Sequence, residues 1–322
     1  MLNDPVLVNE WFAVARSSEL VPGKPLAARL LGLDVVLWRS AEGVHAWQDL
    51  CIHRGAKLSL GTVKNDCLVC PYHAWEYAAS GQCVLIPAQP NHPPPLKAHA
   101  NVFRALEKYG LLWVTLGEPA HAPPDIPQLL DPAFRQLIGG SYAFHAQGPR
   151  ILENFLDVGH LPIVHGGLLG DPALAEIPSY EVESSPEDVI ARDIAIWQPD
   201  PDGTGRPAQV LYTYQVHRPL IASFLKLHNG QSMFMAYLVT PTDEQHSMAW
   251  ALFAMDYARD MPAEEILGFQ DVVIAQDKPV VESQRPELLP LDLREELHLR
   301  SDQTAIAYRR WLLELGMKYG TA

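Results

Sequence analysis

Hydrophobic residues in the first third of the chain occur in short runs that are typical of β-strands. These runs are rich in leucine, β-branched and aromatic residues, are broken by glycine or proline, and cover residues 26–32, 33–40, 43–51 and 109–117. A proline-rich stretch follows, with prolines at positions 119, 123, 124, 127 and 132. Proline fixes φ and lacks a backbone donor, so no regular element should continue through this stretch. We therefore expect two domains, residues 1–118 and 119–322.

The second domain should combine helices with longer strands. A helix is predicted near residues 150–161, and strand-like runs follow at residues 189–198, 208–217, 232–241 and 247–257. The last two runs flank the polar segment 242–246, which suits a hairpin. A helix should begin near Pro262, with Glu264 and Glu265 in its first turn, and a final helix should end at Gly316. The expected fold class is α+β, an all-β N-terminal domain followed by an antiparallel sheet decorated with helices.

Charge and apolar runs exclude several classes of function. The 322 residues carry a net charge of -14, which disfavours binding to nucleic acid or to anionic membranes. The apolar runs are too short for a transmembrane helix, and the first residues do not resemble a secretory signal. We therefore expect a cytoplasmic protein.

The cysteines gather in one segment of the first domain, at positions 51, 67, 70 and 83. In a long chain without an export signal, such a cluster indicates a metal site more than disulfides. Two of them belong to the paired motifs Cys51-Ile52-His53 and Cys70-Pro71-Tyr72-His73. Each motif offers one thiolate and one imidazole, so together they can hold two irons bridged by sulfide, with two cysteines on one iron and two histidines on the other.

Zinc bound by the four cysteines is the alternative for this segment. Cys67 and Cys70 form a C-x-x-C pair, but Cys51 and Cys83 stand singly, without the second pair that such sites usually have. We therefore interpret Cys67 and Cys83 as ordinary packing thiols.

A second candidate site lies between Asn154 and His165. Asn154, Asp157 and His160 are spaced by three, so a helix would place them on one face, and His165 follows beyond Pro162. Two histidines and one carboxylate form the facial triad of non-haem ferrous iron. The carboxylate should come from the helix that begins near Pro262, where periodicity does not decide between Asp271 and Asp277. Two buried structural histidines are the simpler alternative.

The segments CIHRG and CPYHAWEY resemble the Rieske motif of the Rieske non-haem iron oxygenases, and WFAVARSSEL, from Trp11, resembles the N-terminal segment of that family. The segment QDKPVVESQ is similar to the region of the iron-binding aspartate in the dicamba and vanillate O-demethylase branch. This resemblance implies Asp277 as the third iron ligand, with Glu282 as an outside candidate.

The resemblance also implies the activity and the partners. Asp157 would link a cluster-binding histidine of one subunit, His73, to the iron-binding His160 of its neighbour in a homotrimer, and Asn154 would lie near the iron. A small aromatic substrate would undergo O- or N-demethylation, with O2 as co-substrate and electrons from an NAD(P)H-dependent flavin and iron–sulfur reductase or a ferredoxin. A ring-hydroxylating dioxygenase and a non-catalytic Rieske electron carrier are the alternatives.

Overall fold

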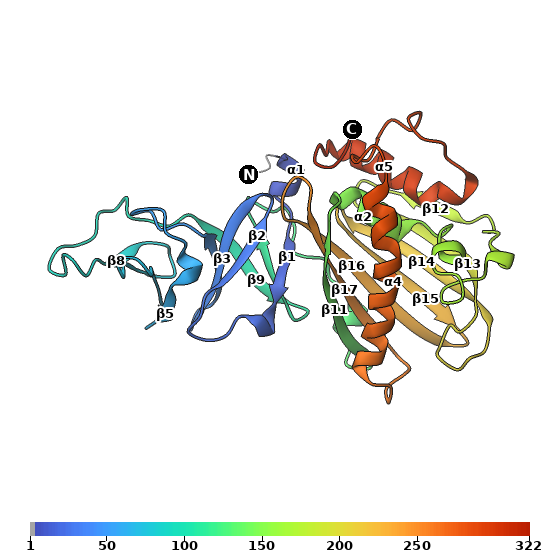
Figure 1. Ribbon diagram of the computed structural model, residues 1–322, viewed down its shortest axis with the longest axis horizontal. Coiled ribbons are helices and arrows are strands. Elements are labelled where there is room, and N and C mark those ends of the chain that lie inside the picture. The colour runs from blue at the N-terminus through green and yellow to red at the C-terminus, as the bar shows by residue number, and fades with distance from the viewer. Residues whose placement is uncertain (1–3) are drawn as a thin grey trace. The chain divides into compact units, whose positions relative to one another are not determined.

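The computed structural model describes residues 4–322, which form two compact units that meet in sequence between Ala122 and Pro123. The first unit is built from β-strands, and the second combines one large sheet with helices (Figure 1). This arrangement confirms the α+β class. Among residues 4–322, none of the helices has the length and apolar character that a membrane crossing requires.

The first unit contains two antiparallel sheets after the short helix α1 (Pro5–Val8). The larger sheet has the order β1 (Phe12–Arg16), β10 (Leu111–Thr115), β9 (Val102–Lys108), β4 (Gly43–Gln48), β3 (Leu33–Ser40) and β2 (Leu26–Leu30). The smaller sheet has the order β5 (Thr62–Lys64), β6 (Cys67–Val69), β7 (Glu76–Tyr77) and β8 (Cys83–Leu85). The predicted strands at residues 26–32, 33–40, 43–51 and 109–117 are therefore confirmed. Strands β1 and β5 to β9 were not predicted.

The core beside the smaller sheet is aromatic. Trp38 and Trp47 are fully buried and meet edge to face with their ring centroids 5.0 Å apart. Tyr77 packs edge-on against Trp47, and Cys51 and Cys70 are buried in the same cluster. Offset and edge-to-face rings are the favoured arrangements of aromatic pairs. The two cysteine loops therefore rest on a rigid core.

The second unit is organised around a seven-stranded antiparallel sheet. Its order is β11 (Arg135–Phe144), β17 (Ser247–Met255), β16 (Gln231–Pro241), β15 (Ile221–His228), β14 (Ala208–Arg218), β13 (Val189–Gln198) and β12 (Glu181–Ser184). The predicted hairpin is confirmed, because Pro241 on β16 pairs with Ser247 on β17 and Thr242 N–H donates to the carbonyl of His246. Strands β11, β12 and β15 were not predicted.

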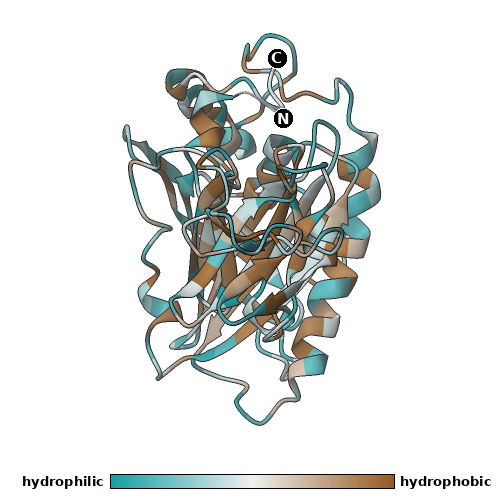
Figure 2. Ribbon diagram, turned by 90° about the vertical axis from the view of Figure 1, so that its left-hand side faces the viewer, coloured by the Kyte–Doolittle hydropathy of each residue, from teal (hydrophilic) through white to brown (hydrophobic). Residues whose placement is uncertain are grey.

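Helices cover this sheet, and the long helix α4 (Ala263–Ser283) crosses it in Figure 1. Strands β16 and β17 are buried over most of their length, whereas in Figure 2 the long helix α4, at the right, alternates between hydrophobic and hydrophilic residues. The helix begins after Pro262 with Glu264 and Glu265 in its first turn, as predicted. The other helices are α2 (Gly148–Leu156), α3 (Leu161–Val164) and α5 (Gln303–Leu315).

The segment from Asp157 to His160 corrects the sequence prediction of one helix over residues 150–161. Helix α2 ends at Leu156, and Asp157 has an extended backbone, with φ -78° and ψ 120°. The Asp157 carboxylate accepts a hydrogen bond from Gly159 N–H at 2.8 Å, and such a local turn competes with continuation of the helix. Pro162 lies in the first turn of a second helix, α3, where proline is well tolerated.

Candidate metal centres and substrate cavity

The two Cys–His motifs form loops with the same backbone hydrogen bonds. Cys51 O accepts from Gly55 N–H at 2.9 Å, and Cys70 O accepts from Ala74 N–H at 3.1 Å. Each loop turns at a residue with positive φ, 72° at Gly55 and 52° at Ala74. Glycine adopts this conformation without steric cost, and alanine does so only with strain. The loops therefore present the two motifs in equivalent local conformations.

The side chains of these loops fit a cluster with two sulfur and two nitrogen ligands. Cys51 and Cys70 are buried, and the rings of His53 and His73 lie with their centroids 4.5 Å apart. The Nδ1 atom of His53 is buried and has no hydrogen-bond partner among residues 4–322. A buried imidazole nitrogen without a partner is costly unless a metal or another group binds it.

The remaining cysteines, Cys67 and Cys83, have the properties of ordinary packing residues. All four cysteines are free, and Cys83 donates weakly to Leu85 O at 3.5 Å. Burial raises the pKa of the Cys83 thiol to about 11, so it keeps its proton at neutral pH. In the part of the chain that the structure describes, the four thiols do not converge on one ion, which argues against the zinc alternative.

The second candidate site brings together two histidines and one carboxylate from separate elements. One ligand atom each of His160, His165 and Asp277 lies within 4.8 Å of the other two, and residues 4–322 contain no other such group of histidine, cysteine or acidic side chains. Asp277 Oδ1 lies 3.0 Å from His165 Nε2 and 3.4 Å from His160 Nε2. His160 and His165 flank the short helix α3, and Asp277 comes from α4.

Burial of unpaired polar atoms shows that this triad fits a metal ion. His165 is 0% exposed and Asp277 is 7% exposed. His165 Nε2 and Asp277 Oδ1 are both buried and make no hydrogen bond within residues 4–322. Two histidines and one carboxylate are the ligand set of non-haem Fe(II) sites that leave positions open for O2 and substrate. A cation between these atoms would satisfy all three side chains.

Gln276 orients His165, and Asp157 lies beside His160 without a hydrogen bond to its ring. Gln276 Oε1 lies 2.8 Å from His165 Nδ1, and Asp157 Oδ2 lies 3.4 Å from His160 Nδ1. Groups that contact the free nitrogen of a metal-binding histidine fix its ring and its tautomer. The family resemblance had implied Asp157 beside His160, but nothing in the sequence predicted Gln276, whose contact depends on how α4 packs.

The other acidic candidates on α4 have different partners. Asp271 is exposed and accepts a hydrogen bond from the Tyr142 hydroxyl at 2.9 Å. Glu282 accepts from His145 N–H at 2.8 Å and lies 3.8 Å from the ammonium of Lys278. The helix therefore directs Asp277, and neither of these residues, toward the two histidines.

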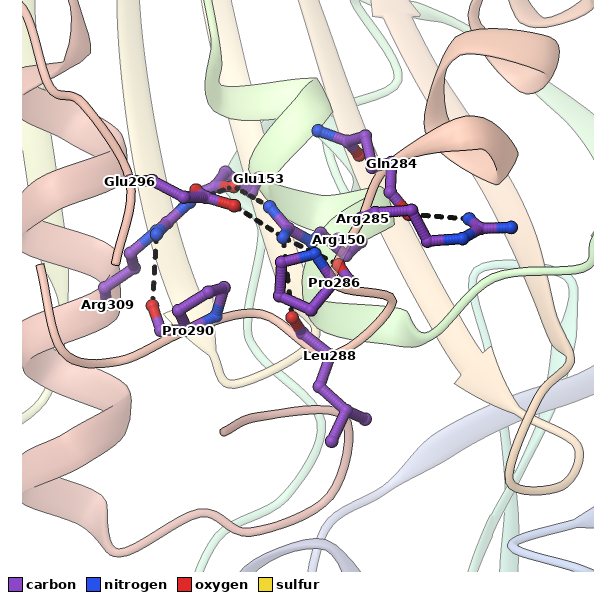
Figure 3. Close-up of polar contacts among 9 residues, drawn as sticks. All are labelled: Arg150, Glu153, Gln284, Arg285, Pro286, Leu288, Pro290, Glu296 and Arg309. Atoms are coloured by element: carbon purple, nitrogen blue, oxygen red, sulfur yellow. Dashed lines mark hydrogen bonds and ion pairs between the residues drawn. The ribbon is translucent and has the colours of Figure 1, made fainter. Parts of the chain in front are cut away.

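A buried charge cluster holds α2, which precedes the triad in the chain (Figure 3). Arg309 on α5 binds Glu153 on α2 through two hydrogen bonds, 2.5 Å from Nε and 2.8 Å from Nη2. Arg309 and Arg150 also each donate to Glu296, at 2.5 and 2.7 Å. Such paired geometry is the form in which buried charges are tolerated. The cluster ties α2 to α5 and to the loop before α5.

A cavity of about 430 Å³ lies beside the triad, between α4 and the large sheet. Its volume falls within the usual range for small-molecule sites. Strands β13 to β17 line it, and Asn154 also reaches it. Phe155 stacks on Tyr237 and Phe224, with ring centroids 5.0 and 5.7 Å apart. Planar rings of this kind favour a flat, aromatic ligand.

Comparison with known proteins agrees with both halves of this description. Residues 10–109 match the Rieske [2Fe-2S] domain, and residues 144–317 match the vanillate O-demethylase oxygenase C-terminal domain. The chain is 34% identical to methylxanthine N1-demethylase NdmA of Pseudomonas putida, over 95% of this chain and 88% of that protein. The solved structure of Pseudomonas putida CBB5 NdmA with caffeine matches with a TM-score of 0.84 and 32% identity, over 96% of this chain and 91% of the other.

Two further relatives match part of the chain. The oxygenase component of dicamba O-demethylase of Stenotrophomonas maltophilia is 36% identical over 49% of this chain and 47% of that protein. The oxidoreductase NdmD of Pseudomonas putida is 40% identical over 37% of this chain and 21% of that protein. The cofactors of this family are a Rieske 2Fe–2S cluster and a mononuclear iron, with O2 as co-substrate. The chain therefore belongs to the Rieske non-haem iron oxygenases, as an oxygenase subunit.

Proposed function

We propose that this oxygenase demethylates a small aromatic substrate at an O-methyl or N-methyl group. The observation that carries this proposal is the triad of His160, His165 and Asp277 at one end of an aromatic cavity. The names of the relatives NdmA and dicamba O-demethylase support it, because both describe demethylation. The names of these relatives give no comparable support to the ring-hydroxylating dioxygenase alternative. A Rieske electron carrier does not require a second metal site such as the triad.

We assign the cluster to Cys51, His53, Cys70 and His73, and the mononuclear iron to the triad. Residues 1–118 would form the Rieske domain and residues 119–322 the catalytic domain. When bound, the two metal centres supply electrons and activate O2. The chain itself contributes the orientation of His165 through Gln276, and a cavity wall that holds the ring of the substrate near the triad.

The overall reaction balances with two electrons from outside. A methyl ether, O2, two electrons and two protons give a hydroxymethyl ether and water, and the hydroxymethyl ether then releases formaldehyde and the phenol. An N-methyl group reacts in the same way and leaves the N–H compound. We infer that an NAD(P)H-dependent reductase or a ferredoxin provides the electrons, and the partial match to the oxidoreductase NdmD supports a partner of this kind.

We also propose a cytoplasmic homotrimer in which each cluster serves the iron of the next subunit. His73 is exposed, and the carboxylate of Asp157 is 38% exposed. Both side chains are therefore accessible to a neighbouring subunit. In such an assembly Asp157 would orient two imidazoles at once, one from each subunit.

A single-turnover experiment tests the demethylase proposal without the native reductase. The protein is reduced chemically without oxygen and mixed with pooled methoxy- and N-methyl-aromatic compounds, and oxygen is then admitted. We expect formaldehyde and a demethylated product. A hydroxylated ring without formaldehyde would instead establish the ring-hydroxylating alternative, and iron analysis in the same sample verifies that both centres are loaded.

A further inference from the structure

Two neighbouring rows of side chains on the large sheet form one wall of the cavity. The first row pairs Tyr214, Phe224, Met235 and Phe253 across strands β14 to β17. The second row pairs Tyr212, Lys226, Met233 and Met255 across the same strands. All eight side chains line the cavity. Lys226 is thus the one charged residue in an otherwise aromatic and thioether surface.

Lys226 is buried where a sheet strand would normally place an apolar side chain. It is 6% exposed, whereas its neighbour Leu227 is 46% exposed on the opposite face. Strand residues alternate between faces, so a one-position change of register would bury leucine and expose lysine. Burying an ammonium group costs free energy that the fold alone does not recover. This inversion indicates that the cavity uses the positive charge.

The hydrogen bonds of Lys226 leave part of its ammonium group unused. Its Nζ atom donates to Pro201 O at 2.7 Å, and a lysine ammonium has three donors. Within residues 4–322, no carboxylate lies close enough to Lys226 to form an ion pair. Asp202, which also lines the cavity, accepts hydrogen bonds from the backbone and hydroxyl of Thr204. Two N–H groups of Lys226 therefore remain for a ligand.

Lys226 lies toward the end of the cavity that is remote from the triad. Lys226 donates to Pro201 O, and Gly203 in the same loop lies beside Met261, just before α4 begins, whereas Asp277 lies toward the C-terminal end of α4. Helix α4 lines the cavity from Glu265 to Asp277, which corresponds to about 18 Å of helix. A bound aromatic ring therefore has space between the triad and the lysine.

We propose that Lys226 binds an anionic oxygen of the substrate, such as a carboxylate, and thereby selects acidic aromatic compounds. This inference rests on the proposed demethylase function and names the class of substrate for it. The ring would lie against Phe155 and Phe224, with the acidic group on Lys226 and the methyl group directed to the triad. A charge-assisted hydrogen bond in a buried cavity is stronger than the same bond in water, so it discriminates acid from neutral analogue.

Matched acids and amides test the role of the lysine. Binding to the oxidised holoenzyme is measured by calorimetry for 3- and 4-methoxybenzoate, 3- and 4-(dimethylamino)benzoate and the amide of each acid. At least one acid should bind about tenfold more tightly than its amide, because a hydrogen bond to a charged group contributes that much or more. Lys226→Met should remove this preference by weakening the acid alone, and Lys226→Arg should keep part of it. The exposed Lys318 provides the control, and Lys318→Met should bind both forms like the wild type.

Two results would overturn the proposal. One is a wild-type protein that binds none of the acids more tightly than its amide. The other is a Lys226→Met variant that loses affinity for acid and amide equally, because the lysine would then only hold the loop at Pro201. Formaldehyde formed from the amides without preference for acids would keep the demethylase function and reject the lysine's role. Preference for acids without formaldehyde would support the role of Lys226 in binding and reject the demethylase function.

Discussion

At the scale of single residues, the hydroxyl of Tyr77 lies 3.2 Å from Cys51 Sγ. Burial raises the pKa of Tyr77, so its hydroxyl keeps the proton that it can donate to a thiolate. Hydrogen bonds to cluster sulfurs stabilise the reduced form and raise the reduction potential. One such bond contributes about 1 kcal/mol, which for one electron corresponds to about 40 mV. Tyr77→Phe should therefore lower the potential of the cluster by roughly this amount in a redox titration.

Tyr72 offers a matched control for this experiment. It lies in the second cysteine loop, is 65% exposed and packs at a tilt against the ring of His73. Tyr72→Phe removes a hydroxyl near the proposed cluster but leaves the contact between the Tyr77 hydroxyl and Cys51 Sγ intact. The reduction potential of the cluster should therefore stay at the wild-type value. Equal potentials for wild type and Tyr77→Phe would show that this hydroxyl does not act on the cluster.

The charge of Lys226 should make acid binding depend on pH. Burial lowers the pKa of Lys226 to about 8, so its positive charge is present below this pH and is lost above it. The affinity for an aromatic acid should fall about tenfold between pH 7 and pH 9, following the protonated fraction of one group. Calorimetry on the same acid and amide pair measures this, and the amide should show no such decrease.

Three ionisable groups around Lys226, Asp202, Tyr212 and Tyr257, keep their charge state in this range. A hydrogen bond from Thr204 lowers the pKa of Asp202, and burial raises the pKa values of Tyr212 and Tyr257. The remaining charged or titratable neighbours are Asp200, His228 and Glu265. An affinity for the acid that stays constant from pH 7 to 9 would therefore exclude Lys226 as its partner.

At the scale of elements, the charge cluster of Arg150, Glu153, Glu296 and Arg309 fixes α2 (Figure 3). Removing one partner of a buried ion pair leaves an uncompensated charge and typically costs about 3–5 kcal/mol. Arg309→Met should lower the free energy of unfolding in urea by this amount. Arg310→Met is the control, because Arg310 is the exposed neighbour on the same helix and should be close to neutral.

A double substitution distinguishes the buried pair from simple loss of packing. Glu153→Met combined with Arg309→Met removes both charges, so it should recover part of the stability that Arg309→Met loses. Additive losses in the double variant would mean that packing, and not charge pairing, makes Arg309 important.

Elements with long, uniform patterns were predictable from the sequence, and strands with mixed or interrupted patterns were not. The hairpin of β16 and β17 has long apolar strands and a polar turn, and these two features were sufficient to predict it. Strand β15 was missed because Lys226 faces inward and Leu227 outward, against the usual pattern of a strand. The helix near residue 150 was drawn too long, because spacing alone does not reveal the turn that Asp157 forms with Gly159. Local patterns often fail where function places the residue.

At the scale of the whole molecule, residues far apart in sequence must meet, and periodicity could not choose among them. Spacing left Asp271 and Asp277 equal, and the resemblance selected Asp277, which the folded chain places 3.0 Å from His165 Nε2. The contact of Gln276 with His165 had no sequence signal at all. The two Cys–His motifs could be predicted without knowledge of the tertiary fold, because both lie in one short segment of the chain.

The proposed trimer predicts a specific effect of Asp157→Asn. The asparagine keeps the size of the side chain but not its charge, so both metal centres should stay loaded while transfer between subunits slows. Loss of an orienting group beside a metal ligand typically costs 10–100-fold, and we expect about this decrease in the rate of cluster reoxidation after oxygen is added to reduced, substrate-bound protein. A wild-type rate would remove Asp157 from the path between subunits.

The two metal centres should also be separable by mutation, because their proposed ligands lie in different units of the chain. With a 2Fe–2S cluster and one mononuclear iron, the wild type should contain about three irons per chain. Asp277→Ala should reduce this to about two while the visible spectrum of the cluster remains, since no cluster ligand changes. Asp271→Ala provides the control from the same helix, because Asp271 is exposed and bonds to Tyr142, so all three irons should remain. If Asp277→Ala keeps three irons, or if Asp271→Ala loses one, the carboxylate ligand has been assigned to the wrong residue.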